Sequence, residues 1–214
     1  MSNEKLHILN HPLLQHKITL LRDKNTGSKE FRELVSEVAM LMTYEATRDL
    51  PLKAVKVQTP IALASSNVIS GRKIAFIPVL RAGLGMVEGA VALVPAAKVG
   101  HIGICRDEKS GNPSDVSVYY CKLPFDIAER DVIIMDLMLG TGATAIKAIE
   151  KVKEAGARSI KLMSVITCPE GVEAVQAVYP DVDIYCGALD ERLNDDLYIV
   201  PGIGDGGDRI FGTK

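Results

Sequence analysis

The chain has 214 residues, of which 47% are hydrophobic and 24% charged, and its formal net charge at pH 7 is −2. This composition can bury a sizeable core, but it provides no general electrostatic attraction to nucleic acid or to an anionic membrane. No apolar run approaches the ~20 residues that span a bilayer, and the mixed polar N-terminus is unlike a signal peptide, so we expect a cytoplasmic protein with one domain over residues 1–214.

The predicted elements alternate between helices and strands. An N-terminal arm, residues 1–27, shows no clear period and precedes a long helix over residues 28–50, with Ser28 as its N-cap and Pro51 as its stop. Extended or strand segments are predicted at 53–63, 73–80, 99–105, 116–123, 132–135, 160–167 and 183–189. Further helices are predicted at 83–93 and 171–178, and a third includes residues 146–152. This order predicts an α/β fold with a mainly parallel central sheet flanked by helices.

Several common sites are excluded by spacing. The four cysteines are widely separated and form no CxxC pair, which is typical of free thiols in a reducing compartment, and no His/Cys cluster has zinc spacing. No glycine loop is followed by the Gly-Lys-Ser/Thr triplet of a P-loop. Gly140-x-Gly142-x-x-Ala145 matches a dinucleotide fingerprint formally, but the next strand, 160–167, lacks the acidic residue that such a site requires.

Residues 131–153, DVIIMDLMLGTGATAIKAIEKVK, predict a phosphate site. A buried strand over residues 132–135 ends in Asp136, a loop rich in glycine and threonine follows, and an amphipathic helix then begins. Glycines let the backbone approach an anion, hydroxyls donate to it, and the helix start presents free N–H groups and a positive dipole end. The carboxylate of Asp136 is placed to hold a sugar hydroxyl or a metal-bound water.

Three other segments carry unusual chemistry. Arg81 and Arg106 each follow a predicted strand, as Asp136 does, and open α/β sheets bind ligands at the carboxyl ends of their strands. A guanidinium suits a diphosphate, although Arg81 could equally be a solvated residue of a turn. The polar segment that starts at Arg106 reads as a hairpin tip or as a lid. The glycine-rich C-terminus, residues 198–209, could present backbone groups to a flat ligand or dock the tail as a tight turn.

The chain resembles the uracil phosphoribosyltransferases, which have the type I phosphoribosyltransferase fold. The resemblance rests on HPLLQHKITLLRDKNT, FRELVSEVAMLMTYEATRDLPL, PVLRAGLGM and YIVPGIGDGGDRIFGTK, and it covers nearly the whole chain. The ending GDGGDRIFGTK is the most specific of these motifs. The resemblance implies transfer of 5-phosphoribose from 5-phospho-α-D-ribose 1-diphosphate to uracil, which gives UMP and diphosphate. It also implies Mg²⁺ bound through the substrate, a homodimer or larger homo-oligomer, and GTP activation in some members.

The same resemblance assigns roles by position. Arg81 and Arg106 match arginines that contact the diphosphate, and Asp205 matches a residue near the ribose diphosphate and its metal. Arg106, Asp136 and Asp205 are thereby the candidate catalytic residues. Residues 190–214 match the uracil-binding segment, and residues 107–118 match a mobile flap. The loop that holds the 5-phosphate and ribose matches Asp136, Leu137, Met138, Leu139, Gly140, Thr141, Gly142, Ala143 and Thr144, and the backbone that reads uracil matches Ile199, Gly204, Asp205 and Gly206.

The chain departs from the family's usual loop, DPMLATGGS, at four positions. Leu137 replaces proline, Gly140 replaces alanine, Ala143 replaces glycine and Thr144 replaces serine, while Gly206 replaces alanine in the tail. Thr144 keeps a hydroxyl and Gly206 keeps its N–H, but Ala143 would be strained if its position required a positive φ. We expect these departures to affect catalytic rate and substrate affinity, although none of them removes a charged group.

Two other functions are compatible with part of this pattern. One is a phosphoribosyltransferase for another base, such as a purine or orotate, which would lack the GDGGDRIFGTK ending. The other is a non-catalytic regulator on the same fold that binds a nucleotide or RNA. Such a protein is expected to have a basic face or to lose residues of the phosphate site, and the chain does neither.

Overall fold

The structure, a computed structural model, describes residues 4–106 and 115–213. Its central sheet has the strand order β1-β10-β9-β8-β4-β6-β7, and β5 also pairs with β4. These neighbours are parallel, except for the antiparallel pair β6 and β7. The strands are β1 (Leu6–Ile8), β4 (Lys73–Leu80), β5 (Lys98–Val99), β6 (His101–Arg106), β7 (Val116–Lys122), β8 (Arg130–Leu139), β9 (Ser159–Thr167) and β10 (Asp183–Leu189). The predicted α/β fold with a mainly parallel sheet is confirmed.

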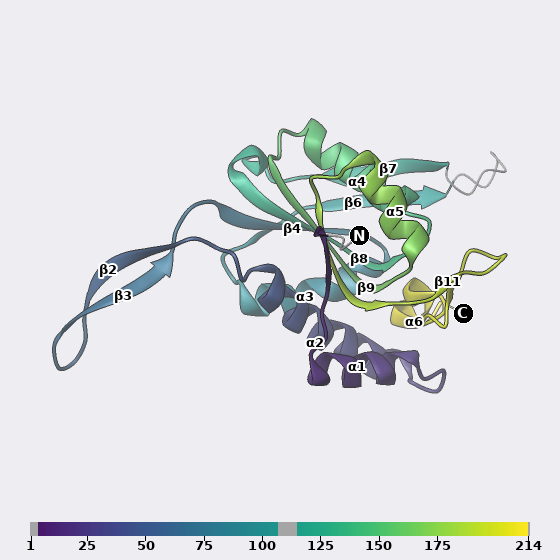
Figure 1. Ribbon diagram of the computed structural model, residues 1–214, viewed down its shortest axis with the longest axis horizontal. Helices are drawn as coiled ribbons and strands as arrows, with labels where there is room; N and C mark the ends of the chain where they lie inside the picture. Colours follow the sequence, from purple (N-terminus) through teal and green to yellow (C-terminus); the bar gives the residue numbers. More distant parts are fainter. Residues whose placement is uncertain (1–3, 107–114, 214) are drawn as a thin grey trace.

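Helices cover both faces of the sheet, so its central strands are continuous apolar runs. One face carries α1 (Pro12–Arg22), α2 (Ser28–Ala46) and α3 (Val87–Leu93), and the other carries α4 (Ala143–Glu154) and α5 (Pro169–Val178) (Figure 1). Each face has its own core: Phe31 and Met42 of α2 belong to one, and Ile149 of α4 and Val175 of α5 to the other. The remaining short helices are η1 (Ala82–Met86), η2 (Ile127–Glu129) and α6 (Gly206–Phe211).

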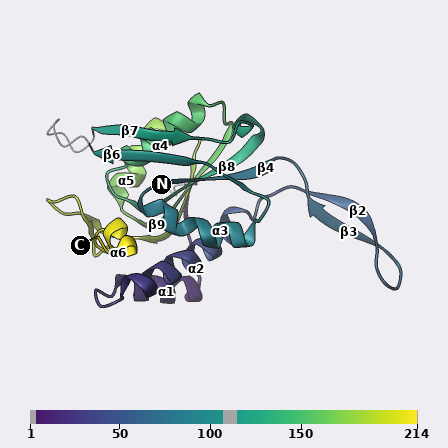
Figure 2. The same ribbon diagram turned by 180° about the vertical axis from the view of Figure 1, so that it is seen from behind.

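A β-hairpin extends away from the body of the molecule (Figures 1 and 2). It consists of β2 (Leu52–Gln58) and β3 (Leu63–Ile69), which pair with each other and with no other described strand. The prediction of one extended segment over 53–63 missed β3, because the segment contains the turn: Thr59 N–H donates to the carbonyl of Ala62 at 3.0 Å. β3 has no apolar alternation, since neither of its faces packs on the core.

The N-terminal arm is more regular than its sequence suggested. It contains β1 and α1, and the buried side chains of α1, Leu14, Ile18 and Leu21, follow helical spacing within only three turns. The N-cap of α2 is Gly27, not Ser28, and the helix ends at Ala46, four residues before the predicted end. A stop at Pro51 was therefore predicted too late.

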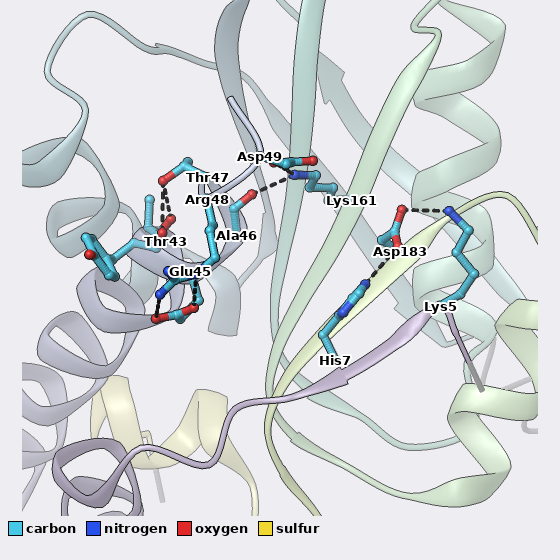
Figure 3. A network of polar contacts seen from close by, with 11 residues as sticks. Lys5, His7, Thr43, Glu45, Ala46, Thr47, Arg48, Asp49, Lys161 and Asp183 are labelled. Carbon is cyan, nitrogen blue, oxygen red and sulfur yellow. Dashed lines mark hydrogen bonds and ion pairs between the residues drawn. The ribbon is translucent and has the colours of Figure 1, made fainter. Parts of the chain in front are cut away.

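Polar contacts tie the N-terminal ends of the strands together (Figure 3). The carboxylate of Asp183 accepts from Lys5 at 3.0 Å and contacts the imidazole of His7 at 2.8 Å, which joins β1 to the start of β10. Lys161 of β9 donates to the carbonyl of Ala46 at 2.7 Å and to Asp49 at 2.5 Å, which holds the end of α2. Structural contacts therefore occupy the N-terminal ends of these strands.

Within the described residues, no helix is long and apolar enough to cross a membrane.

Candidate functional site

A cavity of about 530 Å³ lies at the carboxyl ends of β4, β6 and β8. Three strand ends and the C-terminal tail form its walls. The segment after β4 contributes Arg81, the end of β6 contributes Arg106, and the β8–α4 connection contributes the loop that begins at Asp136. The tail contributes residues 196–199, 204, 205 and 207. Charged groups that are 9 to 124 residues apart in sequence therefore share one cavity, as the rule for open α/β sheets predicted.

The β8–α4 loop has the geometry of an anion cradle. β8 continues to Leu139, so Asp136 lies within the strand and not at its predicted end after Met135. Gly142 is the N-cap of α4 and has φ +83°, a left-handed conformation that favours glycine. Ala143 is the first helical residue. Leu197 is the one non-glycine residue with positive φ in the described parts of the chain, so the strain considered for Ala143 does not arise.

The start of α5 supports this loop from behind. A Cβ atom on Gly171 would lie 2.4 Å from the carbonyl oxygen of Gly140, so the two segments approach as closely as backbone can. The thiol of Cys168 donates to the same carbonyl at 3.3 Å, and burial raises the pKa of this thiol to about 11, which keeps it protonated as a donor. The loop is therefore held on one side by the start of α5, while residues 138–142 and 144 line the cavity.

Asp136 has an unusual electrostatic environment. Burial raises the pKa of its carboxyl group to about 7, although the backbone N–H groups of Leu137 and Met138 favour the charged form. The Leu137 N–H donates to Oδ1 at 2.8 Å. A carboxyl group whose pKa lies near neutral pH, at the wall of a cavity, is characteristic of functional sites.

The two arginines lie on different strand ends. Arg81 donates from Nη2 to Asp208 Oδ1 at 3.3 Å, and its side chain is 56% exposed, so it is free to reorient toward a ligand. Arg106 is exposed at the end of β6. Most of the predicted flap, residues 107–114, lies outside the described residues, and its remainder includes the start of β7 at Val116.

The C-terminal tail is a folded element. A short antiparallel pair, β11 (Arg192–Leu193) and β12 (Ile199–Val200), leads into a turn and then into α6. Asp205 caps α6, because its Oδ1 accepts from the N–H of Asp208 at 2.9 Å. Gly204 has φ +72°, and a Cβ there would meet open space. Glycine is therefore favoured here by its backbone conformation and not by a lack of space for a side chain. The backbone before the helix faces the cavity.

Two partly buried arginines, Arg22 and Arg209, anchor the tail to the rest of the fold. Arg22 of α1 makes paired hydrogen bonds to Asp190 at 2.8 and 2.5 Å and donates to the carbonyl of Gly202 at 2.9 Å, while Asp190 also accepts from the Gly202 N–H at 2.8 Å. Arg209 donates to the carbonyls of Leu21, Asp23 and Ile203. The N-terminal arm thus determines where the tail lies.

Most of the sequence-predicted residues meet in this cavity. Those that line it are Arg81, Arg106, Asp136, Met138, Leu139, Gly140, Thr141, Gly142, Thr144, Ile199, Gly204 and Asp205. Leu137, Ala143 and Gly206 do not line it: Leu137 and Gly206 are buried, and Ala143 faces a neighbouring depression beside Lys147. Asp196, Leu197 and Tyr198 also line the cavity. They lie within the predicted segment 190–214 but were not named as site residues, and their place beside Ile199 was the signal that could have found them.

Comparison with known proteins agrees with this geometry. The profile of the family described as uracil phosphoribosyltransferase matches residues 8–213. A uracil phosphoribosyltransferase from Bacillus cereus (strain B4264) is 59% identical over 210 residues, which cover 98% of this chain and 99% of the relative. The solved AQ2163 protein from Aquifex aeolicus has a TM-score of 0.90 at 36% identity and covers 98% of this chain and 99% of its own.

A more distant solved structure bears on the fold alone. A hypoxanthine-guanine phosphoribosyltransferase from Bacillus anthracis has a TM-score of 0.51 at 14% identity, covering 74% of this chain and 80% of its own. It has the phosphoribosyltransferase fold that the resemblance implied. With the profile matched over nearly the whole length and relatives at 59% identity, the chain belongs to the uracil phosphoribosyltransferase family.

Proposed function

We propose that the protein, acting as one catalytic domain over residues 1–214, transfers 5-phosphoribose from 5-phospho-α-D-ribose 1-diphosphate to uracil and releases UMP and diphosphate. The observation that carries the proposal is that one cavity joins an anion-binding loop, two arginines and the glycine-rich tail. Family membership supports the same reaction, since the relatives at 59% identity are uracil phosphoribosyltransferases.

The chemistry requires little covalent machinery. The C1–diphosphate bond breaks, C1 bonds to N1 of uracil, and the N1 proton is released. Positive charge develops on the ribose ring, as in glycoside hydrolysis, and negative charge accumulates on the leaving diphosphate. Arg81 and Arg106 are the cations that we assign to the diphosphate. The loop from Asp136 to Thr144 receives the 5-phosphate, and the carboxyl of Asp136 accepts from a ribose hydroxyl. Holding both substrates in line supplies much of the rate.

Uracil recognition is assigned to the backbone of the tail. Uracil offers an acceptor–donor–acceptor edge, which peptide N–H and C=O groups of Ile199 and residues 204–206 can pair with. The tail's anchored turn makes these groups rigid. Cytosine presents a donor where uracil has an acceptor, so a buried peptide N–H would remain unpaired, which accounts for discrimination against it.

Magnesium belongs to the proposal through the substrate. Within the described parts of the chain, no group of three or more His, Cys, Asp or Glu side chains could hold a metal ion. The cavity does contain the separate carboxylates Asp136, Asp196 and Asp205. This donor set fits Mg²⁺, which is commonly held by one or two carboxylates together with substrate oxygens. When bound, the ion would neutralise charge on the leaving diphosphate.

Assembly and regulation are the least direct parts of the proposal. Exposed apolar side chains on the β2–β3 hairpin, Leu52, Ile61, Leu63 and Ile69, support association with a second copy of the chain. Light scattering of the purified protein, with and without GTP, measures the oligomeric state and any effect of GTP on it. We also place the enzyme in the cytoplasm, which agrees with four free cysteines.

The reaction is tested by incubating the purified protein with radiolabelled uracil, phosphoribosyl diphosphate and Mg²⁺ and separating UMP. Orotate, hypoxanthine and cytosine serve as competing bases. UMP formation that exceeds transfer to the other bases by at least a hundredfold is expected. Preferred transfer to another base would replace the assignment of uracil, and no transfer to any base would leave the regulator as the better description.

The Arg106→Ala variant tests the role of the positive charge that we assign to the leaving diphosphate. Because the Arg106 side chain is exposed at the end of β6, the variant should unfold with the wild-type midpoint yet lose at least 90% of transfer activity. Arg158→Ala, which removes an exposed arginine outside the cavity, is the matched control and should retain activity. Wild-type turnover by Arg106→Ala would contradict the role.

A further inference from the structure

Leu137 and Gly206 form a close contact that joins the phosphate loop to the tail. A Cβ atom built on Gly206 would lie 2.4 Å from Leu137 Cδ2, 3.3 Å from its Cγ and 3.5 Å from Met138 Cε. Leu137 follows Asp136 directly, and Gly206 follows Asp205 directly. Neither residue lines the cavity, so the contact lies beneath it, between the two segments that we assign to the two substrates.

Neither partner is free to move away from the other. The side chain of Leu137 is fully buried, at 0% exposure, in a cluster that includes Ile203 and Ile210 on either side of Gly206. The Leu137 backbone is held by its hydrogen bond to Asp136 at 2.8 Å. Gly206 is the first residue of α6, whose start is fixed by the Asp205 cap. A change of size at one position must therefore displace the other segment.

We propose that Leu137 and Gly206 are a positioning pair that sets the separation between the ribose-phosphate loop and the base-reading tail. The inference rests on the proposed function and gives these two residues a packing role in addition to the backbone contacts already assigned to their segments. A Cβ at position 206 would lie 2.4 Å from Leu137 Cδ2, so the absence of a side chain at Gly206 matches the presence of a large one at Leu137.

The expected displacement gives the size of the effect. Ordinary contacts to a Cβ begin at 3.4 Å, so a methyl group on Gly206 requires Leu137 Cδ2 to move by about 1 Å. Because the Leu137 side chain is fully buried, it has little room to turn aside, and we expect the loop and the tail to separate by up to that distance. A misplacement of about 1 Å between reacting groups can cost roughly 100-fold in rate. The 5-phosphate contacts belong to the loop alone, so the affinity for phosphoribosyl diphosphate should change little.

A double-mutant cycle tests the pair with Gly206→Ala, Leu137→Ala and the combination of both. Gly206→Ala should lower kcat/KM for uracil about 100-fold while the Kd for phosphoribosyl diphosphate, measured by calorimetry, stays within about threefold. Removing the Leu137 side chain gives the new methyl group space, so the double variant should be at least about tenfold more active than Gly206→Ala. Effects that simply multiply in the double variant would overturn the proposal.

Gly27→Ala is the control, because a Cβ on Gly27 meets no atom within 4 Å. Combined with Leu137→Ala, it should show no coupling. If Gly206→Ala does not fold, the double variant still decides: a folded double variant with activity near that of Leu137→Ala supports the pair, and an inactive one refutes it. Absence of UMP from the wild type would instead refute the proposed function, so the two failures are distinguishable.

Discussion

At the scale of single residues, the titration of Asp136 affects the stability of the fold, and the same side chain lines the cavity. Its carboxyl group is partly buried at the cavity wall, and desolvation raises its pKa to about 7 from the ordinary value near 3.8. Between these pH values the folded protein binds a proton that the unfolded chain does not. The contribution of Asp136 to the free energy of unfolding is therefore most favourable below pH 4, falls as pH rises toward 7, and remains at its lower value above pH 7.

This titration predicts the effect of Asp136→Asn. The amide cannot ionise, and its oxygen can still accept from Leu137 N–H. The free energy of unfolding of the wild type should fall between pH 5 and pH 8, and that of the variant should fall less. Urea unfolding at both pH values measures it. Asp131→Asn on the same strand retains Asp136 and should behave as the wild type. A pH dependence in Asp136→Asn equal to that of the wild type would contradict the burial argument.

Gly140 and Gly142 differ in what they require, although both belong to the same loop. A Cβ on Gly140 would make ordinary contacts, 3.5 Å to Leu193 and 3.9 Å to Ile199, and its φ is not positive. Gly140→Ala should therefore raise the free energy of unfolding by about 0.4–1 kcal/mol through the unfolded chain. Gly142 has φ +83° and would place a Cβ 2.9 Å from Ala174, so Gly142→Ala should lower it by about 1–3 kcal/mol. Urea unfolding of the two variants, with opposite signs expected, checks the assignment.

At the scale of elements, α6 shows one side chain with two functions. Asp205 caps the helix and also lines the cavity, so loss of activity on its removal would not by itself identify a catalytic charge. The same ambiguity applies to Thr141, whose hydroxyl accepts from Ala143 N–H at 3.4 Å while it lines the cavity.

Two substitutions at Asp205 separate these functions. Asp205→Asn keeps a capping oxygen and removes the charge, whereas Asp205→Ala removes both and should cost about 1 kcal/mol of stability. We expect both to lower kcat, and only Asp205→Ala to lower the thermal midpoint. Full activity in Asp205→Asn would show that the cap, and not the charge, explains the residue.

At the scale of the whole molecule, the two ends of the chain depend on each other. Arg22 of α1 and Asp190 after β10 form a pair in which the Asp190 side chain is 4% exposed, and both hold Gly202 of the tail. Breaking a buried pair by removing one partner leaves an uncompensated charge. The segment to which we assign base recognition thus depends on a helix that contributes no residue to the cavity.

Arg22→Ala should therefore lower the free energy of unfolding by about 3 kcal/mol and raise the KM for uracil more than that for phosphoribosyl diphosphate. Lys17→Ala on the same helix is the control. It breaks a 2.6 Å pair with Glu37, which is 51% exposed, and should cost less than about 1 kcal/mol. Urea unfolding and steady-state kinetics measure both effects. Equal costs for the two variants would show that the buried pair has no special role.

The sequence alone predicted every central strand and most of the candidate site. Apolar runs such as KIAFIPVL could only be buried strands, and the residues that follow them had to gather at one edge of a parallel sheet. Arg81, Arg106 and Asp136 were found in this way, because each is next to or within such a strand. The glycines and threonines of the loop were found because local backbone chemistry requires those residue types.

Tertiary structure decided what no local pattern contains. α1 was missed because the burial of its side chains depends on partners distant in sequence. β3 was missed because nearly all of its residues are exposed. The raised pKa of Asp136 results from burial by neighbouring segments, and the contact of Leu137 with Gly206 joins residues far apart along the chain. The sequence determined which groups are available for phosphate and base. Packing decided the distances between them, because those distances are sums over many contacts that only the folded chain brings together.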